Sequence, residues 1–358
     1  CLVNRGVASK AEVSEFLNPR LKLLADPFLI PNMDAAVERL WKAREDNEQL
    51  LIYGDYDVDG VSSTALLAEM LTELGWTVQP YLPSRFDGGY GLSAVALEKC
   101  LEKFDVDIVL AVDCGSTAVE AIEFLNSKKV DVLVLDHHQV SVPPPEPLAM
   151  VNPQVSNDYP NFQELCSVGL AFKLAHALVK RGRQEGLQKE RDLDLKQYLD
   201  LVALGTVADL VPLTGENRKL VRSGLEQLSE TTRPGLVSLK KISNVSGPVT
   251  VFNIGFHLGP RLNAAGRMDN PDASLNLLLA KDRYEAEKAA ETLDNYNNER
   301  RKIERDISTQ AVENVRERFD PEKDFVIVEG NMEWHLGVIG IVASRVMREF
   351  YRPTFILA

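Results

Sequence analysis

The 358-residue sequence lacks the features that mark several large classes of protein. No apolar run approaches the roughly 18 to 20 residues that a membrane-spanning helix needs. The N-terminus has no basic flank followed by a short apolar core, as a signal peptide would have. We therefore expect a cytoplasmic protein without a membrane segment. There are only four cysteines, far apart and without a C-x-x-C pair, which excludes a disulfide framework and a structural zinc site and predicts free thiols: Cys1, Cys100, Cys114 and Cys166.

An excess of basic residues is also missing. The 40 Lys and Arg residues stand against 53 Asp and Glu residues, giving a net charge of −13. This balance argues against a protein that coats nucleic acid, although it leaves room for a local basic groove and for acidic metal ligands. The sequence contains no G-x-S-x-G, H-E-x-x-H or Walker A motif, and no G-x-G-x-x-G after a predicted strand, so the chemistries of those motifs are not indicated.

What the sequence does contain is an alternation of short apolar runs with helical patterns. It predicts strands over 49–54, 76–82, 106–112 and 130–135, with helices over 62–74, 94–103 and 116–128. Short buried strands that alternate with helices indicate an α/β fold, with a mostly parallel sheet covered by helices on both faces.

The rest of the chain is expected to add a mainly helical segment over 164–230 and one long helix over 282–319. A strand-and-helix alternation follows at 325–328, 338–350 and 354–357. At about 150 residues per domain the length favours two or three domains. Because the chain opens at Cys1 and stops within a strand, we expect a fragment whose second α/β domain is incomplete. The expected division is an N-terminal extension at 1–48, a catalytic domain at 49–281, a connecting helix at 282–320 and the start of a second domain at 321–358.

The first acidic motif follows the first predicted strand as Asp55-Tyr-Asp57-Val-Asp59-Gly60. In an extended segment, carboxylates at alternate positions point the same way, which is favourable only beside a cation. A calcium loop opens with the same spacing, but it needs a Glu at its twelfth position, where this chain has Leu66, and a helix before it. We therefore assign the three carboxylates to the carboxyl end of a parallel strand, where open α/β sheets bind ligands.

Two more predicted strands end in ionisable residues, at Asp113 and at Asp136-His137-His138. Considered by itself, Asp113 would more often be the N-cap of the next helix. Because two neighbouring strands also end in acidic residues, Asp113 becomes a candidate bridging ligand between two metal ions. We assign one histidine to a metal and the other to the substrate or to an outer contact. Asp209 lies in an apolar helical segment, and a carboxylate buried there needs a partner that compensates its charge. Carboxylates with imidazole and no thiolate suit Mn²⁺ or Mg²⁺, and two such ions could activate water and hold a phosphoester for hydrolysis.

These motifs, in this order and spacing, resemble those of the DHH phosphoesterase superfamily, Gly205-Thr-Val-Ala-Asp209 being the fourth. Within it, three further segments are similar to signatures of the RecJ family of single-strand-specific exonucleases: the segment from Pro83 through Arg85 to Gly91, the segment from Gly259 through Arg261 and Asn263 to Arg267, and the segment from Trp334 to Arg345. The resemblance implies a DHH domain joined by a long helix to a DHHA1 domain around a groove. A late glycine-rich signature of the DHHA1 domain and the OB-fold that commonly follows it are absent, which truncation would explain.

The resemblance also implies roles for individual residues. The catalytic set would be Asp57, Asp59, Asp113, His137, His138 and Asp209, and all of these except His138 would hold two divalent ions, Mn²⁺ or Mg²⁺, with Asp113 bridging. Asp55 and Asp136 would lie just outside the ligands. Arg85 would hold the 5′ phosphate of DNA, and His138, Arg261 and Asn263 would contact the substrate near the scissile bond.

The implied activity is a metal-dependent exonuclease that degrades single-stranded DNA from the 5′ end to 5′ mononucleotides in DNA repair and recombination. The implied partners are single-stranded DNA, a single-strand-binding protein and a helicase, with the enzyme acting as a monomer. Two alternatives stay open: a small-nucleotide phosphodiesterase or pyrophosphatase of the same superfamily, and a catalytically silent replication scaffold. The intact acidic motifs argue against the scaffold.

Overall fold

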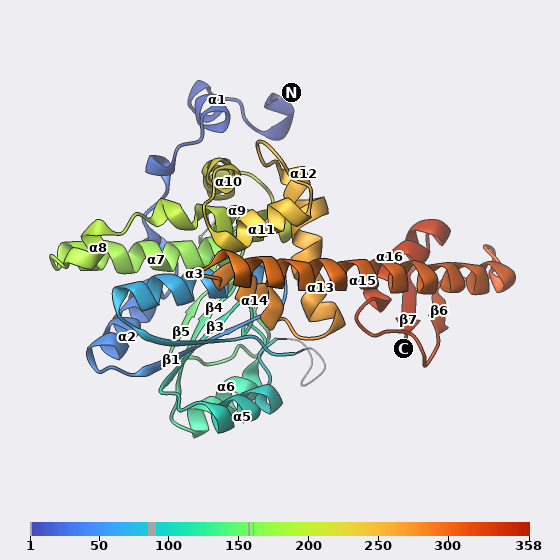
Figure 1. Ribbon diagram of the computed structural model, residues 1–358, viewed down its shortest axis with the longest axis horizontal. Helices are drawn as coiled ribbons and strands as arrows, with labels where there is room; N and C mark the ends of the chain where they lie inside the picture. Colours follow the sequence, from blue (N-terminus) through green and yellow to red (C-terminus); the bar gives the residue numbers. More distant parts are fainter. Residues whose placement is uncertain (1, 85–90, 157, 160) are drawn as a thin grey trace.

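The computed structural model describes residues 2–84, 91–156, 158–159 and 161–358 (Figure 1). Its centre is a five-stranded parallel sheet in the order β2-β1-β3-β4-β5. The strands are β1 (Gln49–Gly54), β2 (Thr77–Tyr81), β3 (Ile108–Val112), β4 (Asp131–Leu135) and β5 (Ala149–Val151). The order changes direction between β1 and β3, and ligands of open α/β sheets bind at the carboxyl ends of strands beside such a point.

Both faces of this sheet are buried, so the strands are apolar at successive positions. On one face, Leu50, Ile52 and Leu110 pack with helices α2, α3 and α7 in the larger core. On the other face, Leu51, Val109 and Val132 pack with helices α5 and α6 in a second core. Alternate side chains of a strand point to opposite faces, and this explains why one strand supplies both cores. The fold class predicted from sequence is confirmed.

The helices next to the sheet have the following bounds: α2 (Met33–Glu45), α3 (Val58–Leu74), α5 (Ala94–Lys103), α6 (Val119–Ser127) and α7 (Ser167–Gln184). Helix α3 begins four residues before the predicted start, because Asp57 caps it. Helix α6 begins three residues after the predicted start, at Val119. The short strand β5 was not predicted, since its three residues follow a proline-rich loop and show no alternation.

The N-terminal segment lies outside the sheet as η1 (Val3–Arg5), α1 (Lys10–Leu17), η2 (Leu21–Leu23) and η3 (Pro27–Leu29). Buried charges hold it to the helical part of the molecule. The ammonium of Lys173, whose side chain is fully buried, forms an ion pair with Glu216 and donates to the carbonyl of Ala25. Lys219 reaches Glu15 of α1 at 2.7 Å. Buried charges are tolerated only when paired in this way, so the contacts fix where the segment runs.

A group of helices follows α7 and packs around α3 and α7 (Figure 1). These elements are α8 (Gln188–Asp192), η5 (Leu195–Tyr198), α9 (Leu199–Ala208), α10 (Gly215–Ser229), α11 (Pro234–Ile242), α12 (Val251–Asn253), the π-helical turn η6 (Ile254–Leu258), α13 (Gly259–Met268) and α14 (Asp272–Leu279). The short helical turn η4 (Pro153–Val155) lies between β5 and α7. In the described part of the chain, no helix is both long and apolar enough to cross a bilayer.

Helix α15 (Arg283–Arg318) has 36 residues, about 54 Å at 1.5 Å per residue, and matches the predicted long helix within one residue at each end. Its first half, with Ala290 and Leu293, belongs to the large core. Its second half, with Ile307 and Ala311, packs on a separate small core with β6 (Ile327–Gly330), α16 (Ile339–Phe350) and β7 (Thr354–Leu357). The two strands pair in parallel, and Figure 1 shows this unit at the far end of α15.

Candidate metal centre

The first acidic motif forms the turn between β1 and α3. Asp57 caps α3: its Oδ1 accepts from the backbone N–H of Asp59 at 2.9 Å and of Gly60 at 3.1 Å. Asp59 therefore lies in the first turn of the helix, and the extended arrangement expected from the alternating spacing is wrong. Gly60 is required for close approach, because a Cβ there would lie 2.5 Å from the carbonyl oxygen of Asp55.

Asp59 is buried, and the N-terminus of α7 holds its carboxylate. Oδ2 accepts from the backbone N–H of Ser167 at 2.7 Å, and Oδ1 accepts from that of Val168 at 2.8 Å. The free N–H groups and dipole at a helix N-terminus stabilise an anion. Sequence analysis did not identify Ser167, because a serine at the start of an apolar helix carries no sign that it will reach a site more than 50 residues away.

Asp113 follows β3 and is also buried. Its backbone has a φ of 62°, a left-handed conformation that Asp adopts more readily than most residues. Its Oδ1 accepts from the hydroxyl of Ser167 at 2.9 Å. Asp113 does not cap α6, whose N-cap residue is Ala118. The geometry thus favours the ligand interpretation of Asp113 over the capping one.

His137 lies at the middle of the cluster. Its Nε2 is 3.5 Å from Oδ1 of Asp113, 3.7 Å from Oδ2 of Asp209 and 3.9 Å from Oδ2 of Asp59. Burial lowers the pKa of His137 to about 4, so the ring is neutral at pH 7 and offers a lone pair. Both Nε2 of His137 and Oδ2 of Asp209 are buried without a hydrogen-bond partner. Unpartnered buried polar atoms are costly, and a cation between them would satisfy both.

His138 differs from its neighbour. Its Nδ1 lies 2.7 Å from Oδ1 of Asp136, and this hydrogen bond raises the pKa of His138 to about 9. Asp136 is buried, which alone would raise its pKa, but the contacts with His138 and Ser116 lower that pKa to about 2. His138 is therefore a cation at neutral pH, and its side chain is 56% exposed. The two adjacent histidines therefore differ in charge and in exposure.

Burial and mutual repulsion raise the pKa values of the carboxyl groups at this centre. Burial, followed by the charges of Asp209 and Asp57, raises the pKa of Asp59. Burial and the neighbouring aspartates likewise raise that of Asp113, and burial and Asp57 raise that of Asp209 to about 6. Each raised pKa shows that, among the residues that the structure describes, no nearby positive charge balances the negative charge of these carboxylates.

The ligand atoms fall into overlapping groups, within each of which they lie within 4.8 Å of one another. One group is Asp59, His137 and Asp209. A second group is Asp55, Asp57 and Asp113. Asp55, which was expected just outside the ligands, thus has a carboxylate oxygen within 4.8 Å of the ligand atoms of Asp57 and Asp113. A third joins Asp113 to Asp136, His137 and His138. Asp113 is in two of the groups, which is the position a bridging ligand needs.

The residues expected to contact the substrate do not all reach the acidic centre. Asn263 on α13 reaches the acidic turn, since its Oδ1 accepts from the backbone N–H of Val58 at 3.0 Å. Arg261 turns to α15, where its Nε donates to Asp294 at 2.8 Å and its guanidinium donates to the carbonyl of His257. Arg85 lies outside the described residues. Cys1 also lies outside them, and the other three cysteines are free and buried.

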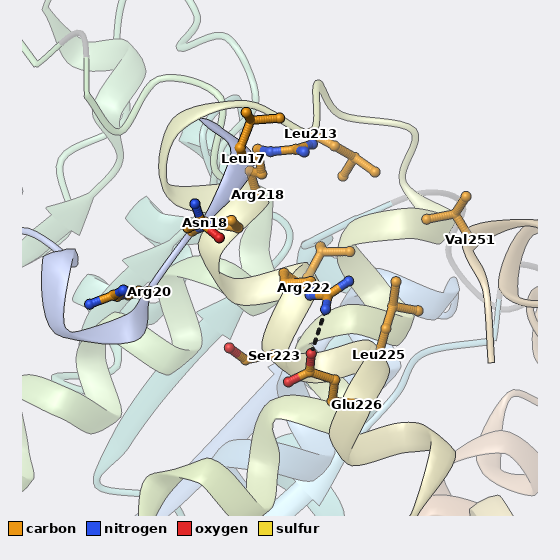
Figure 2. Close-up of a pocket in the computed structure, with 12 residues that line it drawn as sticks. Leu17, Asn18, Arg20, Leu213, Arg218, Arg222, Ser223, Leu225, Glu226 and Val251 are labelled. Carbon is orange, nitrogen blue, oxygen red and sulfur yellow. Dashed lines mark ion pairs between the residues drawn. The ribbon is translucent and has the colours of Figure 1, made fainter. Parts of the chain in front are cut away.

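A cavity of about 510 Å³ lies away from this centre, between the N-terminal segment and α10 (Figure 2). Arg20, Arg218 and Arg222 are among its lining residues, and Arg222 pairs with Glu226 at 3.0 Å. Its lining residues belong to none of the metal-ligand groups found in the described ranges. The acidic centre itself is at the carboxyl ends of β1, β3 and β4.

Residues 49–206 match the family described as DHH family, N-terminal domain. This stretch contains the sheet and every acidic motif except Asp209. The fold and the arrangement of the acidic motifs thus define the chain as a protein of the DHH class.

Within this class the chain belongs to the RecJ family. It is 38% identical over 358 residues to the single-stranded-DNA-specific exonuclease RecJ of Bacillus subtilis, covering 99% of this chain and 44% of that protein. It is 34% identical to RecJ of Escherichia coli, covering 99% of this chain and 62% of that protein. The chain thus spans about half the length of the curated relatives it matches.

Two solved structures are similar to the whole fold. One is exonuclease RecJ bound to manganese, with a TM-score of 0.81 and 33% identity, covering 92% of this chain and 80% of that one. The other is RecJ from Thermus thermophilus in complex with Mn²⁺, with a TM-score of 0.82 and 32% identity, covering 99% of this chain and 49% of that one. The likeness therefore includes the long helix and the small C-terminal unit.

Proposed function

We propose that this chain is the catalytic part of a metal-dependent exonuclease that degrades single-stranded DNA in the 5′-to-3′ direction and releases 5′ mononucleotides in DNA repair and recombination. The observation that carries the proposal is the pair of unpartnered buried atoms, Nε2 of His137 and Oδ2 of Asp209, facing the carboxylates of Asp59 and Asp113. The names of the RecJ relatives supply the substrate class.

The donor set fits divalent ions of the hard, oxygen-preferring kind. We assign Asp59, His137 and Asp209 to one ion and Asp57 to the other, with Asp113 shared between them. Asp55 lies in the same group as Asp57 and could add an oxygen. Bound there, two Mn²⁺ or Mg²⁺ ions would supply a water activated for attack and positive charge at the phosphate. The solved RecJ structures were described with manganese or magnesium, which agrees with this choice.

Residues around this set would position the substrate. His138 is a cation at neutral pH and is exposed enough to contact a phosphate oxygen, while Asp136 holds its ring. Such a preorganised donor would offset negative charge that develops in the transition state. Ser167 donates to Asp113 and, through its backbone, to Asp59, so it orients two ligands together.

Arg85 would determine the polarity by holding the 5′ phosphate, and Arg261 and Asn263 would act near the scissile bond. A guanidinium can make two charge-assisted hydrogen bonds to phosphate, each worth about 1.5 to 3 kcal/mol. Arg85→Ala should therefore lose kcat/KM mainly on 5′-phosphorylated strands, by roughly 10-fold to 150-fold per bond. An equal loss of kcat/KM on 5′-phosphorylated and 5′-hydroxyl strands would show that Arg85 does not bind the 5′ phosphate.

The division of the chain at 49, 282 and 321 into extension, catalytic domain, connecting helix and second domain is also a proposal. The separate core that surrounds β6, β7 and α16 supports the second domain, whereas the boundary at 49 has no such support, because α2 packs in the larger core of the sheet. A cytoplasmic location, a monomeric state, and a single-strand-binding protein and a helicase as partners complete the proposal.

The decisive experiment is digestion of end-labelled single strands with Mn²⁺, with the products sized. Successive mononucleotides released from the 5′ end would support the proposal. Cleavage of dinucleotides and cyclic nucleotides with intact long strands would instead identify a small-nucleotide phosphodiesterase. Absence of cleavage by a folded, Mn²⁺-binding protein would favour a scaffold.

A further inference from the structure

An aromatic pair lies exposed on the helix that leads to the candidate metal centre. The rings of Phe252 and Phe256 stack with centroids 4.6 Å apart and planes 25° apart. Their side chains are nevertheless 57% and 70% exposed. The ring of Phe252 also lies 5.7 Å, centroid to centroid, from that of His257. Single exposed apolar residues are common, but two stacked aromatic rings that both stay largely exposed form a flat surface with a free face.

The pair stands on one continuous helical segment formed by α12, η6 and α13. Phe252 and Phe256 are four residues apart, and Asn263 follows Phe256 by seven within this segment. Asn263 contacts the acidic turn through the backbone of Val58. One continuous helical segment thus links the metal centre to the aromatic pair.

The local backbone explains how the rings are presented. Pro260 has no N–H to donate back to the carbonyl of Phe256, and the backbone N–H of Gly259 instead donates to the carbonyl of Ile254, one residue beyond the α-helical partner. This π-helical turn widens the helix beneath Phe256. Such turns are rare and occur frequently at functional sites.

From these observations we propose that Phe252 and Phe256 form a stacking platform for bases of the single strand, beyond the nucleotide at the metal centre. The inference rests on the proposed function. Base stacking on aromatic side chains is tolerant of sequence, because every base has a flat π-face. Seven helical residues span about 10 Å, which corresponds to roughly three nucleotides of a strand whose bases are stacked at the 3.4 Å rise of duplex DNA. The platform would therefore contact nucleotides about three steps from the scissile bond.

The proposal predicts a loss that depends on substrate length. In the double variant Phe252→Ala/Phe256→Ala, kcat/KM on a 20-nucleotide strand relative to a dinucleotide should fall roughly 5-fold to 150-fold for each stacked base lost. Phe256→Trp should keep most of the ratio and Phe256→Leu should lower it, which separates stacking from apolar contact. Phe325→Ala is the matched control, because Phe325 is 73% exposed and lies near β6.

A second measurement separates this inference from the proposed activity. Strands with 2-aminopurine at the third or fourth nucleotide are titrated into the full chain with Ca²⁺ in place of Mn²⁺, and stacking quenches the fluorescence. Quenching that the double variant loses supports the platform even if the wild-type chain cleaves nothing, in which case only the proposed activity fails. An unchanged length ratio together with unchanged quenching would overturn the platform. Loss of affinity for a protein partner, with strand binding unchanged, would assign the pair to a protein interface instead.

Discussion

The side-chain oxygen of Asn263 accepts a hydrogen bond from the backbone N–H of Val58 at 3.0 Å, which joins α13 to the first turn of α3 across 205 positions of sequence. The same helix presses on the turn through Gly266, where a Cβ would lie 2.6 Å from the ring of Tyr56. The turn that carries Asp57 and Asp59 is thus held from both sides, by its own strand and helix and by a helix about 200 residues later.

Asn263→Ala should loosen this turn. The N–H of Val58 would lose its acceptor in a partly buried position, a loss of about 1 to 3 kcal/mol. We expect lower stability in urea and roughly a tenfold fall in kcat. Asn126→Ala is the control, since Asn126 is exposed and donates to a loop carbonyl. A variant with wild-type kcat would show that the acidic turn holds its shape alone.

Asp113→Ala should abolish metal-dependent cleavage and leave the fold intact. Asp113 shares a group with Asp57, the proposed ligand of one ion, and its Oδ1 lies 3.5 Å from Nε2 of His137, a proposed ligand of the other, so its loss affects both proposed ions. Charge stabilisation by metal ions is worth several kcal/mol, or about three powers of ten in rate. Near-normal Mn²⁺-dependent cleavage by the folded variant would contradict a bridging role.

Metal-free protein should lose stability as the pH rises from about 4 to about 8. Burial and neighbouring charges raise the folded pKa of Asp59 and raise that of Asp209 to about 6, against a value of 3.8 for an unperturbed Asp. A raised folded pKa gives stability that is complete below pH 4 and is lost as the pH passes the folded value. Melting temperatures in EDTA should therefore fall by several degrees over this range.

Mn²⁺ should remove most of that fall, because it compensates the ionised carboxylates. The stabilisation by Mn²⁺ should accordingly be small at pH 5 and largest near pH 8. Asp209→Asn should flatten the metal-free profile. Parallel profiles with and without Mn²⁺ would argue that these carboxylates bind no ion.

The pair of His138 and Asp136 should set the alkaline limb of the rate profile. His138 has a pKa raised to about 9 by its hydrogen bond to Asp136, so it keeps its charge below that pH and loses it above. We expect kcat/KM to fall as His138 loses its proton. Asp136→Asn should move this limb to lower pH, toward the ordinary histidine value of about 6.5. Circular dichroism checks the fold, and an unmoved limb would assign it to another group.

Gly60→Ala should damage the centre without touching a ligand. The added Cβ would meet the backbone of Asp55 at 2.5 to 2.8 Å, and backbone atoms cannot rotate away. Overpacking of this kind typically costs about 1 to 3 kcal/mol, so stability should drop and the acidic turn should shift. Gly255→Ala is the control, because its Cβ would meet nothing within 4 Å. Equal stability and Mn²⁺ affinity in both variants would disprove the close contact.

Much of this fold follows from local pattern. The runs that form β1, β3 and β4 are continuously apolar because both faces of the sheet are buried, and this made them visible in the sequence. The bounds of α5 and β7 agree with the prediction residue for residue. The start of α3 could not be read in the same way, since the acidic turn is itself the beginning of the helix.

The parts of the site that were missed depend on tertiary contacts. Ser167 and Val168 serve the centre because α7 happens to begin beside Asp59, and no local signal in residues 166–168 reports that placement. The same is true of the ion pair that turns Arg261 toward Asp294. Sequence could propose which carboxylates gather, because strand ends of a parallel sheet share one edge, but it could not show which donors would meet them there.

The helix α15 has one buried stripe that serves two cores: Ala290 and Leu293 pack in the large core, and Ile307 and Ala311 pack in the small one. Each residue of a helix adds about 1.5 Å and about 100° of rotation, so the spacing between the two halves also fixes their relative angle. A single inserted residue near 300 would rotate the small unit by about 100°, a little more than a quarter of a turn, around the axis. An insertion of seven would displace it by about 10 Å with a rotation of only about 20°. The length of this helix can therefore vary only by steps close to a whole number of turns, such as about seven or eleven residues, if the small unit is to keep facing the same side of the molecule.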